Sequence, residues 1–315
     1  MHENALLTHI YSRSRSLMDA FPQVLLGPGD DCAVVEVNDG GPILLKVDQL
    51  IEHRHFTLGT PLELIARKAL ARPLSDIAAM AGTPIAALAG CVMRRDYPQS
   101  RANALFDAIH ASGMALGVPV VGGDIASFLD DEGPLTLSIS MIGRVHARRG
   151  PVRRSTACAG DDVYVTGTIG GSFLESPNRE FVFVGGGKHL TFTPRVREAT
   201  WLADALDGDL HAMMDVSDGL GLDAARLATA SGVRVELESS LIPLSEPTRR
   251  VLHAIADGED YELLFTVSRG TALPTHVPGV GTPLTRIGTV VAGAGCVLRE
   301  GDRVIDVSQK GFEHA

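Results

Sequence analysis

The chain has 315 residues, of which 45% are hydrophobic and 21% charged, so it is long enough for two domains and its composition excludes a disordered protein. Its 28 basic and 38 acidic residues give a net charge of −10, which argues against nonspecific binding to nucleic acid or to an anionic membrane. There is no basic leader followed by an apolar stretch and no run of about 18 apolar residues, so we expect neither a signal peptide nor a membrane span. The four cysteines are widely separated, which indicates reduced thiols in the cytoplasm.

The first elements are predicted from short apolar runs and turn residues. Residues 31–37 and 43–50 are two such runs split by Asn-Asp-Gly-Gly-Pro, which predicts a β-hairpin. Residues 61–71 have helical periodicity, and the Arg-Pro pair that follows, which contains Pro73, predicts the end of that helix.

The chain continues with alternating strands and helices. Residues 83–93 are typical of a buried strand, and residues 98–116 of a long amphipathic helix. Residues 118–124 are predicted to be a strand that runs into a Gly-Gly-Asp turn, and residues 135–145 alternate as a strand should.

A polar segment rich in Gly, Pro and Arg at 146–162 predicts the domain boundary, which divides the chain into residues 1–150 and 151–315. Residues 171–194 are predicted to be irregular. Strands and helices are intermixed in the second half without a regular βαβ order, which favours an α+β fold. The other elements predicted there are a strand at 162–170, a helix at 196–206, an extended segment leading into a helix at 212–232, and strands at 233–239 and 260–267.

Acidic residues recur in glycine-containing turns and at strand ends, while the P-loop, the Gly-x-Gly-x-x-Gly fingerprint and the protein-kinase signatures are missing. A carboxylate beside buried residues is costly unless it is paired or binds a cation. Oxygen ligands without Cys or His fit Mg²⁺, which usually accompanies phosphate. The acids of this pattern are Asp30, Asp31, Asp48, Asp76, Asp124, Asp215, Asp218, Asp257, Glu259 and Asp260.

Each of these residues also has an ordinary structural interpretation. A single Asp in a turn is most often turn chemistry. Ser75 or Asp76 is a suitable cap for a second short helix, and residues 122–124 are suitable for a tight turn. His55 alone is more often a surface or core histidine than a ligand. Five separate acidic turns beside apolar strands nevertheless favour a clustered cation site.

Several motifs occur together in an order that resembles the thiamine-monophosphate kinases, within the wider superfamily of aminoimidazole ribonucleotide synthetase-like ATP-binding enzymes. The resemblance runs from about residue 27 to the closing motif KGFEH. It implies a mixed α/β protein with an N-terminal mixed sheet and helices used for dimerisation and a C-terminal α/β sandwich that completes the active site. The motifs are GPGDDCAVV, VDQLIEHRHF, RKALARPLSDIAAMAG, VGGDIA, RRSTACAGDDVYVTGT, MMDVSDGLGLDAARLATASGV and DGEDYELLFTV.

The resemblance implies a cytoplasmic homodimer that transfers the γ-phosphoryl group of ATP to thiamine monophosphate, with several Mg²⁺ ions. The implied metal ligands are Asp31, Asp48, Asp76, Asp124, Asp215 and Asp218, of which Asp48, Asp124 and Asp218 are also the implied catalytic residues. The implied ATP contacts are Gly123, Asp124, Arg154 and Ser217, and the implied acceptor contacts are His55, Glu259 and Phe312. Such a reaction needs positioning and charge neutralisation more than a covalent nucleophile, and the acceptor phosphate is itself the attacking group.

The chain departs from the family pattern at several places. Lys46 and Val47 precede the metal-binding Asp where the family has hydroxyl residues, Pro73 replaces an Asn, and Asp257 replaces a Gly. Residues 171–190 include an extra segment that could be a lid, an interface or a surface hairpin. Lys46 either replaces a metal charge near the phosphates or has ended catalysis. Two alternatives therefore stay open: a kinase with a different phosphorylated acceptor, and a nucleotide-binding paralogue without turnover.

Overall fold

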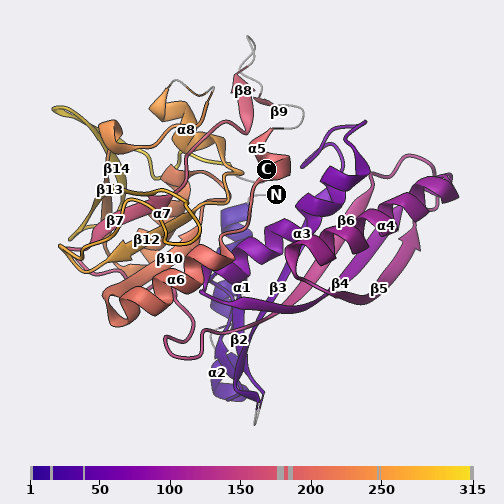
Figure 1. Cartoon of the computed structure of the whole chain (residues 1–315), viewed down its shortest axis with the longest axis horizontal. Coiled ribbons are helices and arrows are strands. Elements are labelled where there is room, and N and C mark those ends of the chain that lie inside the picture. The colour runs from indigo at the N-terminus through magenta and orange to yellow at the C-terminus, as the bar shows by residue number, and fades with distance from the viewer. Residues whose placement is uncertain are drawn as a thin grey trace.

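The computed structural model describes residues 3–14, 17–37, 40–175, 181–183, 187–246, 248 and 250–312. Two large β-sheets lie side by side, and helix α3 (Leu62–Ala79) runs between them (Figure 1). Among the described residues, no helix is both long and apolar enough to cross a membrane.

The first sheet has six strands in the order β1-β2-β3-β6-β4-β5. All its neighbouring strands are antiparallel except β4 and β5, which are parallel. The predicted hairpin is confirmed, because β2 and β3 pair antiparallel from Ala33 opposite Leu45 to Glu36 opposite Pro42. The strands are β1 (Val24–Leu26), β2 (Ala33–Glu36), β3 (Pro42–Ile51), β4 (Thr83–Met93), β5 (Val120–Ser127) and β6 (Thr136–Arg144).

Helices α3 and α4 (Gln99–Leu116) cover one face of this sheet (Figure 1). Strand β3 shows the two faces clearly, since Leu44 and Leu50 are buried while Leu45 and Val47 are exposed. Alternate residues of a strand point to the same face. The residues between the exposed positions, Lys46 and Asp48, therefore lie on the helix-covered face, where the candidate site is found.

The predicted helix end at Pro73 is wrong, because α3 is one continuous helix of 18 residues with Pro73 inside it. Proline lacks an N–H donor and normally clashes with the carbonyl four residues earlier, here that of Ala69. The helix nevertheless continues because side chains on both sides of Pro73 are fully buried, among them Leu70 and Ile77. Burial between the two sheets outweighs the local preference. The expected second short helix is thus the end of α3, and neither Ser75 nor Asp76 is a cap.

The predicted turn at 122–124 is also wrong, because these residues lie within β5. Gly123 pairs with Ala89 of β4, and a Cβ atom on Gly123 would lie 1.9 Å from the Ala89 carbonyl oxygen. The glycine therefore allows a close approach of two strands rather than a reversal of the chain.

The second sheet has seven strands in the order β10-β12-β7-β13-β11-β14-β15, of which β11 and β14 are parallel. Met213 of β10 packs in the cluster that contains α6, and the next residue, Met214, packs in the cluster that contains α7 and α8, so helices cover both faces. The predicted α+β class with two mixed α/β units is confirmed. The elements are β7 (Asp162–Thr166), β10 (Leu210–Asp215), β11 (Arg234–Glu238), β12 (Leu263–Val267), β13 (Leu284–Val291), β14 (Gly295–Glu300), β15 (Arg303–Asp306), α6 (Val196–Leu206), α7 (Leu220–Ser231) and α8 (Val251–Asp257).

The segment predicted to be irregular contains a small two-stranded sheet and one helical turn. Strand β8 (Phe173–Glu175) pairs antiparallel with β9 (Phe181–Phe183), and α5 (Lys188–Thr191) follows. Part of the triple glycine at 185–187 lies outside the described residues. The predicted domain boundary falls between the end of β6 and the start of β7 and stays a prediction. The remaining helices are α1 (Glu3–Ser14), α2 (Leu17–Ala20), η2 (Asp207–Asp209) and η3 (Ser239–Leu241).

Candidate active site

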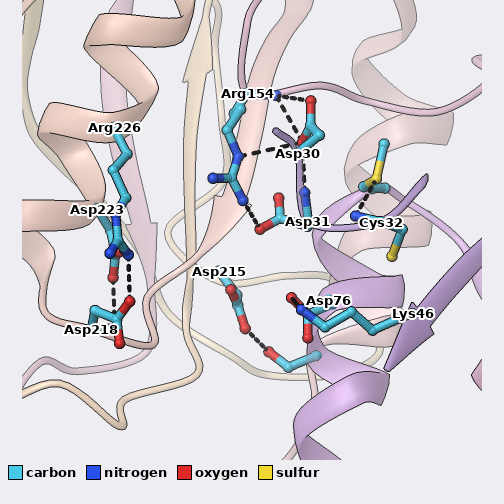
Figure 2. A network of polar contacts seen from close by, with 12 residues as sticks. Asp30, Asp31, Cys32, Lys46, Asp76, Arg154, Asp215, Asp218, Asp223 and Arg226 are labelled. Carbon is cyan, nitrogen blue, oxygen red and sulfur yellow. Dashed lines mark hydrogen bonds and ion pairs between the residues drawn. The ribbon is translucent and has the colours of Figure 1, made fainter. Parts of the chain in front are cut away.

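Three buried carboxylates from both halves of the chain meet where the two sheets face each other. Asp31 lies in the loop between β1 and β2, Asp76 lies in α3, and Asp215 is the last residue of β10. One oxygen of each lies within 4.8 Å of the others (Figure 2). Because α3 packs against β10, residues 140 positions apart in sequence come into contact: Ser75 Oγ donates to Asp215 Oδ2 at 2.6 Å. We refer to Asp31, Asp76 and Asp215 as the acid cluster.

Burial makes the ionised form of two carboxylates in the acid cluster costly. Burial, followed by the nearby charge of Asp31, raises the pKa of Asp215 to about 7. Burial also raises the pKa of Asp76 well above its usual value. Gathered carboxylates that resist ionisation in this way are stabilised by a bound cation.

Arg154 is the cation on the far side of the acid cluster. Its Nε lies 3.4 Å from Asp30 Oδ1, and its guanidinium also pairs with Asp31 (Figure 2). Burial lowers the pKa of Arg154, but these two carboxylates raise it above its usual value, so the guanidinium stays charged. Asp31 Oδ2 is buried and has no hydrogen-bond partner within the described part of the chain.

The donor set of the acid cluster fits Mg²⁺. All three residues offer carboxylate oxygens, which are the hard ligands that Mg²⁺ prefers. The orphaned Asp31 Oδ2 is a buried acceptor that a cation would satisfy. Asp31, Asp76 and Asp215 are therefore the residues that could hold such an ion.

Lys46 connects the acid cluster to Asp48. Its Nζ lies 2.7 Å from Asp76 Oδ1 and 3.7 Å from Asp48 Oδ1. Burial alone would lower the pKa of Lys46, but the carboxylates of Asp48 and Asp76 raise it above its usual value. The lysine is thus a permanent cation among the predicted metal ligands.

Asp218 belongs to a second polar group at the start of α7. Asp218 pairs with Arg226, whose Nη1 also lies 3.0 Å from Asp223 Oδ1 (Figure 2). Asp223 Oδ2 accepts the backbone N–H groups of Asp218 at 2.9 Å and Gly219 at 3.1 Å. Burial, then the charge of Asp218, raises the pKa of Asp223 to about 8. The sequence prediction missed Asp223 and Arg226, although their spacing of three on one helix is a signal for an ion pair.

Two cavities meet at this site, and both are lined by Lys46, Ser217 and Asp218. The first, which we call the acid cavity, has a volume of about 670 Å³ and is lined by the acid cluster and Arg154. The second, which we call the acceptor cavity, has a volume of about 460 Å³. Two compartments that share three polar side chains can hold two ligands with their reacting ends together.

The acceptor cavity gathers the three predicted acceptor residues, His55, Glu259 and Phe312, from segments far apart in sequence. His55 Nδ1 accepts the backbone N–H of Ile51 at 2.9 Å, which fixes the ring after the end of β3. The Phe312 N–H donates to the Asp218 carbonyl at 2.8 Å, which fixes the last described residue against the turn before α7.

Basic side chains that the sequence prediction did not assign also line the acceptor cavity. The Arg54 guanidinium lies over the Phe312 ring, 4.5 Å from its centroid. Arg72 of α3 donates from Nη1 to the Gln49 carbonyl at 2.6 Å, while its buried Nε has no hydrogen-bond partner among the residues described. The continuation of α3 through Pro73 is what brings Arg72 and Asp76 to one site.

Asp124 and Gly123 do not join the acid cluster within one chain. The sheet register places Asp124 in one row with Gly90, Ser138 and Gln49, on the face opposite to Asp48. Strand β5 is also three positions from β3, or roughly 14 Å at the usual strand spacing. Their predicted roles stay predictions, and a single chain does not assemble them with Asp48.

A second group of metal-ligand types, Cys158, Asp161 and His211, lies in the second half of the chain. Asp161 Oδ2 accepts the Cys158 N–H at 2.8 Å and lies 2.9 Å from His211 Nδ1. These contacts satisfy the carboxylate of Asp161, so the group differs from the acid cluster with its orphaned oxygen.

Comparison with known proteins places this fold in a class. Residues 29–145 match the family model for the AIR synthase related protein N-terminal domain, and residues 159–299 match the one for the C-terminal domain. The two domains are thus those of an AIR synthase related protein. Within that class the chain belongs to the thiamine-monophosphate kinase family, as the motifs predicted.

Relatives of similar length support the family assignment. The thiamine-monophosphate kinase of Rhodopirellula baltica is 34% identical over 330 residues, with 99% of this chain and 97% of the relative covered. That of Escherichia coli K12 is 31% identical over 339 residues, with 99% and 98% covered. The solved structure of AaThiL complexed with AMPPCP and TMP matches with a TM-score of 0.77 at 26% identity, and covers 100% of this chain and 97% of that one.

Proposed function

We propose that this protein is a thiamine-phosphate kinase, which transfers the γ-phosphoryl group of ATP to the phosphate of thiamine monophosphate and forms thiamine diphosphate and ADP. The observation that carries this function is the junction of the acid cavity and the acceptor cavity at Lys46, Ser217 and Asp218. Full-length relatives of the same name and a similar protein complexed with AMPPCP, an ATP analogue, and TMP support it.

The arrangement suits direct transfer between two phosphates. ATP fits the acid cavity, where Arg154 and Ser217 are its proposed contacts. Mg²⁺ held by Asp31, Asp76 and Asp215, with Asp48 and Asp218 nearby, would neutralise phosphate charge. The acceptor phosphate attacks with its own oxygen, so no side chain has to remove a proton. The protein contributes alignment and fixed charge, which are the main sources of rate in phosphoryl transfer.

The acceptor cavity has features that suit thiamine monophosphate. Phe312 offers a flat aromatic face for a heterocycle, and Glu259, which pairs with the buried Lys68, places a carboxylate where the thiazolium cation would lie. His55, Arg54 and Arg72 supply positive or donor groups for the phosphate. The cavity therefore combines the charges of a ligand that is cationic at one end and anionic at the other.

A homodimer is part of the proposal. The face of the first sheet opposite α3 and α4 exposes Leu45, Val47, Leu88 and Ile142 on three adjacent strands. A contiguous apolar sheet face of this kind is typical of a protein–protein interface. Asp124 lies on the same face, so we assign its predicted metal role to the site of the partner subunit. Residues 1–150 would then form the dimerising unit and residues 151–315 the domain that completes the site.

The four cysteines are free, and three of them, Cys32, Cys91 and Cys296, are buried. Unpaired buried thiols are typical of a reducing compartment, which supports a cytoplasmic location.

Phosphorus NMR of a reaction with ATP, Mg²⁺ and thiamine monophosphate tests the function. We expect ADP and thiamine diphosphate to appear in equal amounts, and no thiamine diphosphate when unphosphorylated thiamine replaces the monophosphate. Equal ADP release with and without the acceptor would contradict the proposal. Product formation only with another phosphorylated acceptor would favour the alternative kinase. Tight AMPPCP binding without turnover would favour the nucleotide-binding paralogue, in which Lys46 has ended catalysis.

A further inference from the structure

Lys46 lies between two carboxylates that the family resemblance implies to be metal ligands. Its Nζ lies between Asp76, at 2.7 Å, and Asp48, at 3.7 Å, and both carboxylates are implied metal ligands. The side chain is 21% exposed, so the ammonium is partly desolvated and faces the junction of the two cavities. The family pattern that the motifs follow has a hydroxyl residue at this position instead of a lysine.

The ammonium and a bridging metal exclude each other. Mg²⁺ binds carboxylate oxygen at about 2.0–2.1 Å. An ion bonded to both Asp48 and Asp76 would need the space that Nζ occupies, and its charge would repel the ammonium. The acid cluster still offers a place for one ion beside Lys46. Asp31 Oδ2 has no hydrogen-bond partner among the described residues, and all three acids of the cluster line the acid cavity.

We propose that Lys46 is a catalytic residue that replaces one divalent cation, so that its ammonium contacts the phosphoryl group in transfer and the site binds one metal ion fewer than it would without the lysine. The inference rests on the proposed kinase function. Lysine offers three N–H donors, of which Asp76 accepts one, so the others can reach phosphate oxygens at the junction.

The chemical step needs only charge from Lys46. The bond between the γ-phosphorus and the bridging oxygen of ADP breaks and leaves its electron pair on ADP, while an oxygen of the acceptor phosphate forms the new bond. No proton moves, and the ammonium stays charged throughout. A fixed cation beside the moving group stabilises charge that develops there, as a metal ion does.

The test counts bound Mn²⁺ per chain by electron paramagnetic resonance in the presence of AMPPCP, with Mn²⁺ as a stand-in for Mg²⁺. Lys46→Ser and Lys46→Ala each remove the ammonium and leave room for an ion between Asp48 and Asp76. We expect both variants to bind one Mn²⁺ more than the unchanged protein. Lys46→Arg keeps a cation and should keep the original count.

Lys310→Ser is the matched control, because Lys310 is exposed and lines neither cavity. It should leave the count unchanged. A count in Lys46→Ser and Lys46→Ala that equals or falls below that of the unchanged protein would overturn the proposal. Thermal melting identifies a variant that fails to fold. If only one of Lys46→Ser and Lys46→Ala folds, its Mn²⁺ count alone decides the test.

A kinetic readout follows from the same substitution. The initial rate of Lys46→Ser should depend on Mg²⁺ with a higher order than that of the unchanged protein, because an additional ion must bind before transfer. The Mn²⁺ count involves no turnover, so a failure of the kinase assay and a failure of this inference are distinguishable.

Discussion

At the scale of single residues, the acid cluster carries a desolvation cost, because the pKa values of Asp76 and Asp215 stay raised although Lys46 lies nearby. Asp31, Asp76 and Asp215 are each less than a tenth exposed, and their oxygens crowd within 4.8 Å. Buried like charges destabilise the folded state and shift proton binding. Side chains that lower the stability of the folded protein in this way are typical of active sites.

Removal of one charge from the acid cluster should stabilise the metal-free protein. Asp215→Asn keeps an acceptor for Ser75 but removes a buried charge, so at pH 8 in EDTA we expect the melting temperature to rise by about 2–4 °C, or ~1 kcal/mol. Asp302→Asn, at an exposed position, is the control and should change little. If Asp215→Asn melts at a lower temperature than the unchanged protein, the negative charge of Asp215 is already compensated in the folded state. The same variant should lose Mg²⁺-dependent binding of AMPPCP.

The stability of the metal-free protein should fall as the pH rises. Burial, followed by Asp31, raises the folded-state pKa of Asp215 from 3.8 to about 7, so the folded state binds this proton more tightly than the unfolded state. Its contribution is present at low pH and is lost between about pH 4 and pH 7. Asp223, whose pKa burial and Asp218 raise to about 8, extends the loss to that pH.

Mg²⁺ competes with these protons, so the increase in melting temperature that Mg²⁺ causes should be larger at pH 8 than at pH 5. Thermal melts in EDTA and in Mg²⁺ at both pH values measure the effect. A metal-free protein that becomes more stable from pH 5 to pH 8 would refute the electrostatic account of the acid cluster.

At the scale of elements, helix α3 and strand β5 position the predicted site residues. Helix α3 carries Arg72 toward the acceptor cavity and Asp76 toward the acid cluster within about one turn, and its buried length passes through Pro73. Strand β5 presents Asp124 at the edge of the first sheet, and Gly123 lets it approach β4.

Gly123→Ala should loosen β5. Its added Cβ would lie 1.9 Å from the Ala89 carbonyl oxygen, so the strands must separate, and we expect a loss of about 2 kcal/mol or more in stability. Hydrogen exchange of the β5 amides should quicken as well. Gly27→Ala adds a Cβ that meets nothing within 4 Å and serves as the control. Equal stability of the two variants would show that the close approach of β5 to β4 is not needed.

Elements and site differ in how far the sequence predicts them. The hairpin of β2 and β3 follows from local alternation, and the acids of the cluster follow from their position after apolar runs. Pro73 and the Gly-Gly-Asp segment were misjudged because burial between sheets and close strand pairing overrule local preference.

The partners of the acids were also beyond local patterns. The contact of Lys46 with Asp76 spans 30 positions, and that of Arg154 with Asp31 spans 123. Such pairs depend on how distant segments of the chain pack, for which a single sequence contains no local signal. The sequence showed these four residues in the right motifs but not in these pairs.

At the scale of the whole molecule, the site is built by both domains and, in our proposal, by two subunits. Asp31 and Asp76 come from the first domain and Asp215 from the second, so ligands at the junction would hold the domains together. The apolar side chains that are exposed on the face of the first sheet opposite α3 and α4 form the proposed subunit interface.

Leu88→Asp should convert the dimer into a monomer. Leu88 is 49% exposed on strand β4 of the apolar sheet face, where a buried charge would be strongly unfavourable. Light scattering coupled to gel filtration measures the mass, and kinase activity should fall at least tenfold because Asp124 no longer reaches the partner. Leu129→Asp, at a 93% exposed leucine in the connection after β5, should remain dimeric and active. A dimer that survives Leu88→Asp would place the interface elsewhere.

The most direct measurement is the anomalous scattering of Mn²⁺ in crystals grown with AMPPCP and thiamine monophosphate. We predict an anomalous peak bound by Asp31, Asp76 and Asp215, the triphosphate analogue in the acid cavity, thiamine monophosphate in the acceptor cavity, and the two phosphate ends meeting beside Lys46. Manganese bound away from the acid cluster, or the two ligands with their phosphates pointing apart, would contradict the assignment of this junction as the place of phosphoryl transfer.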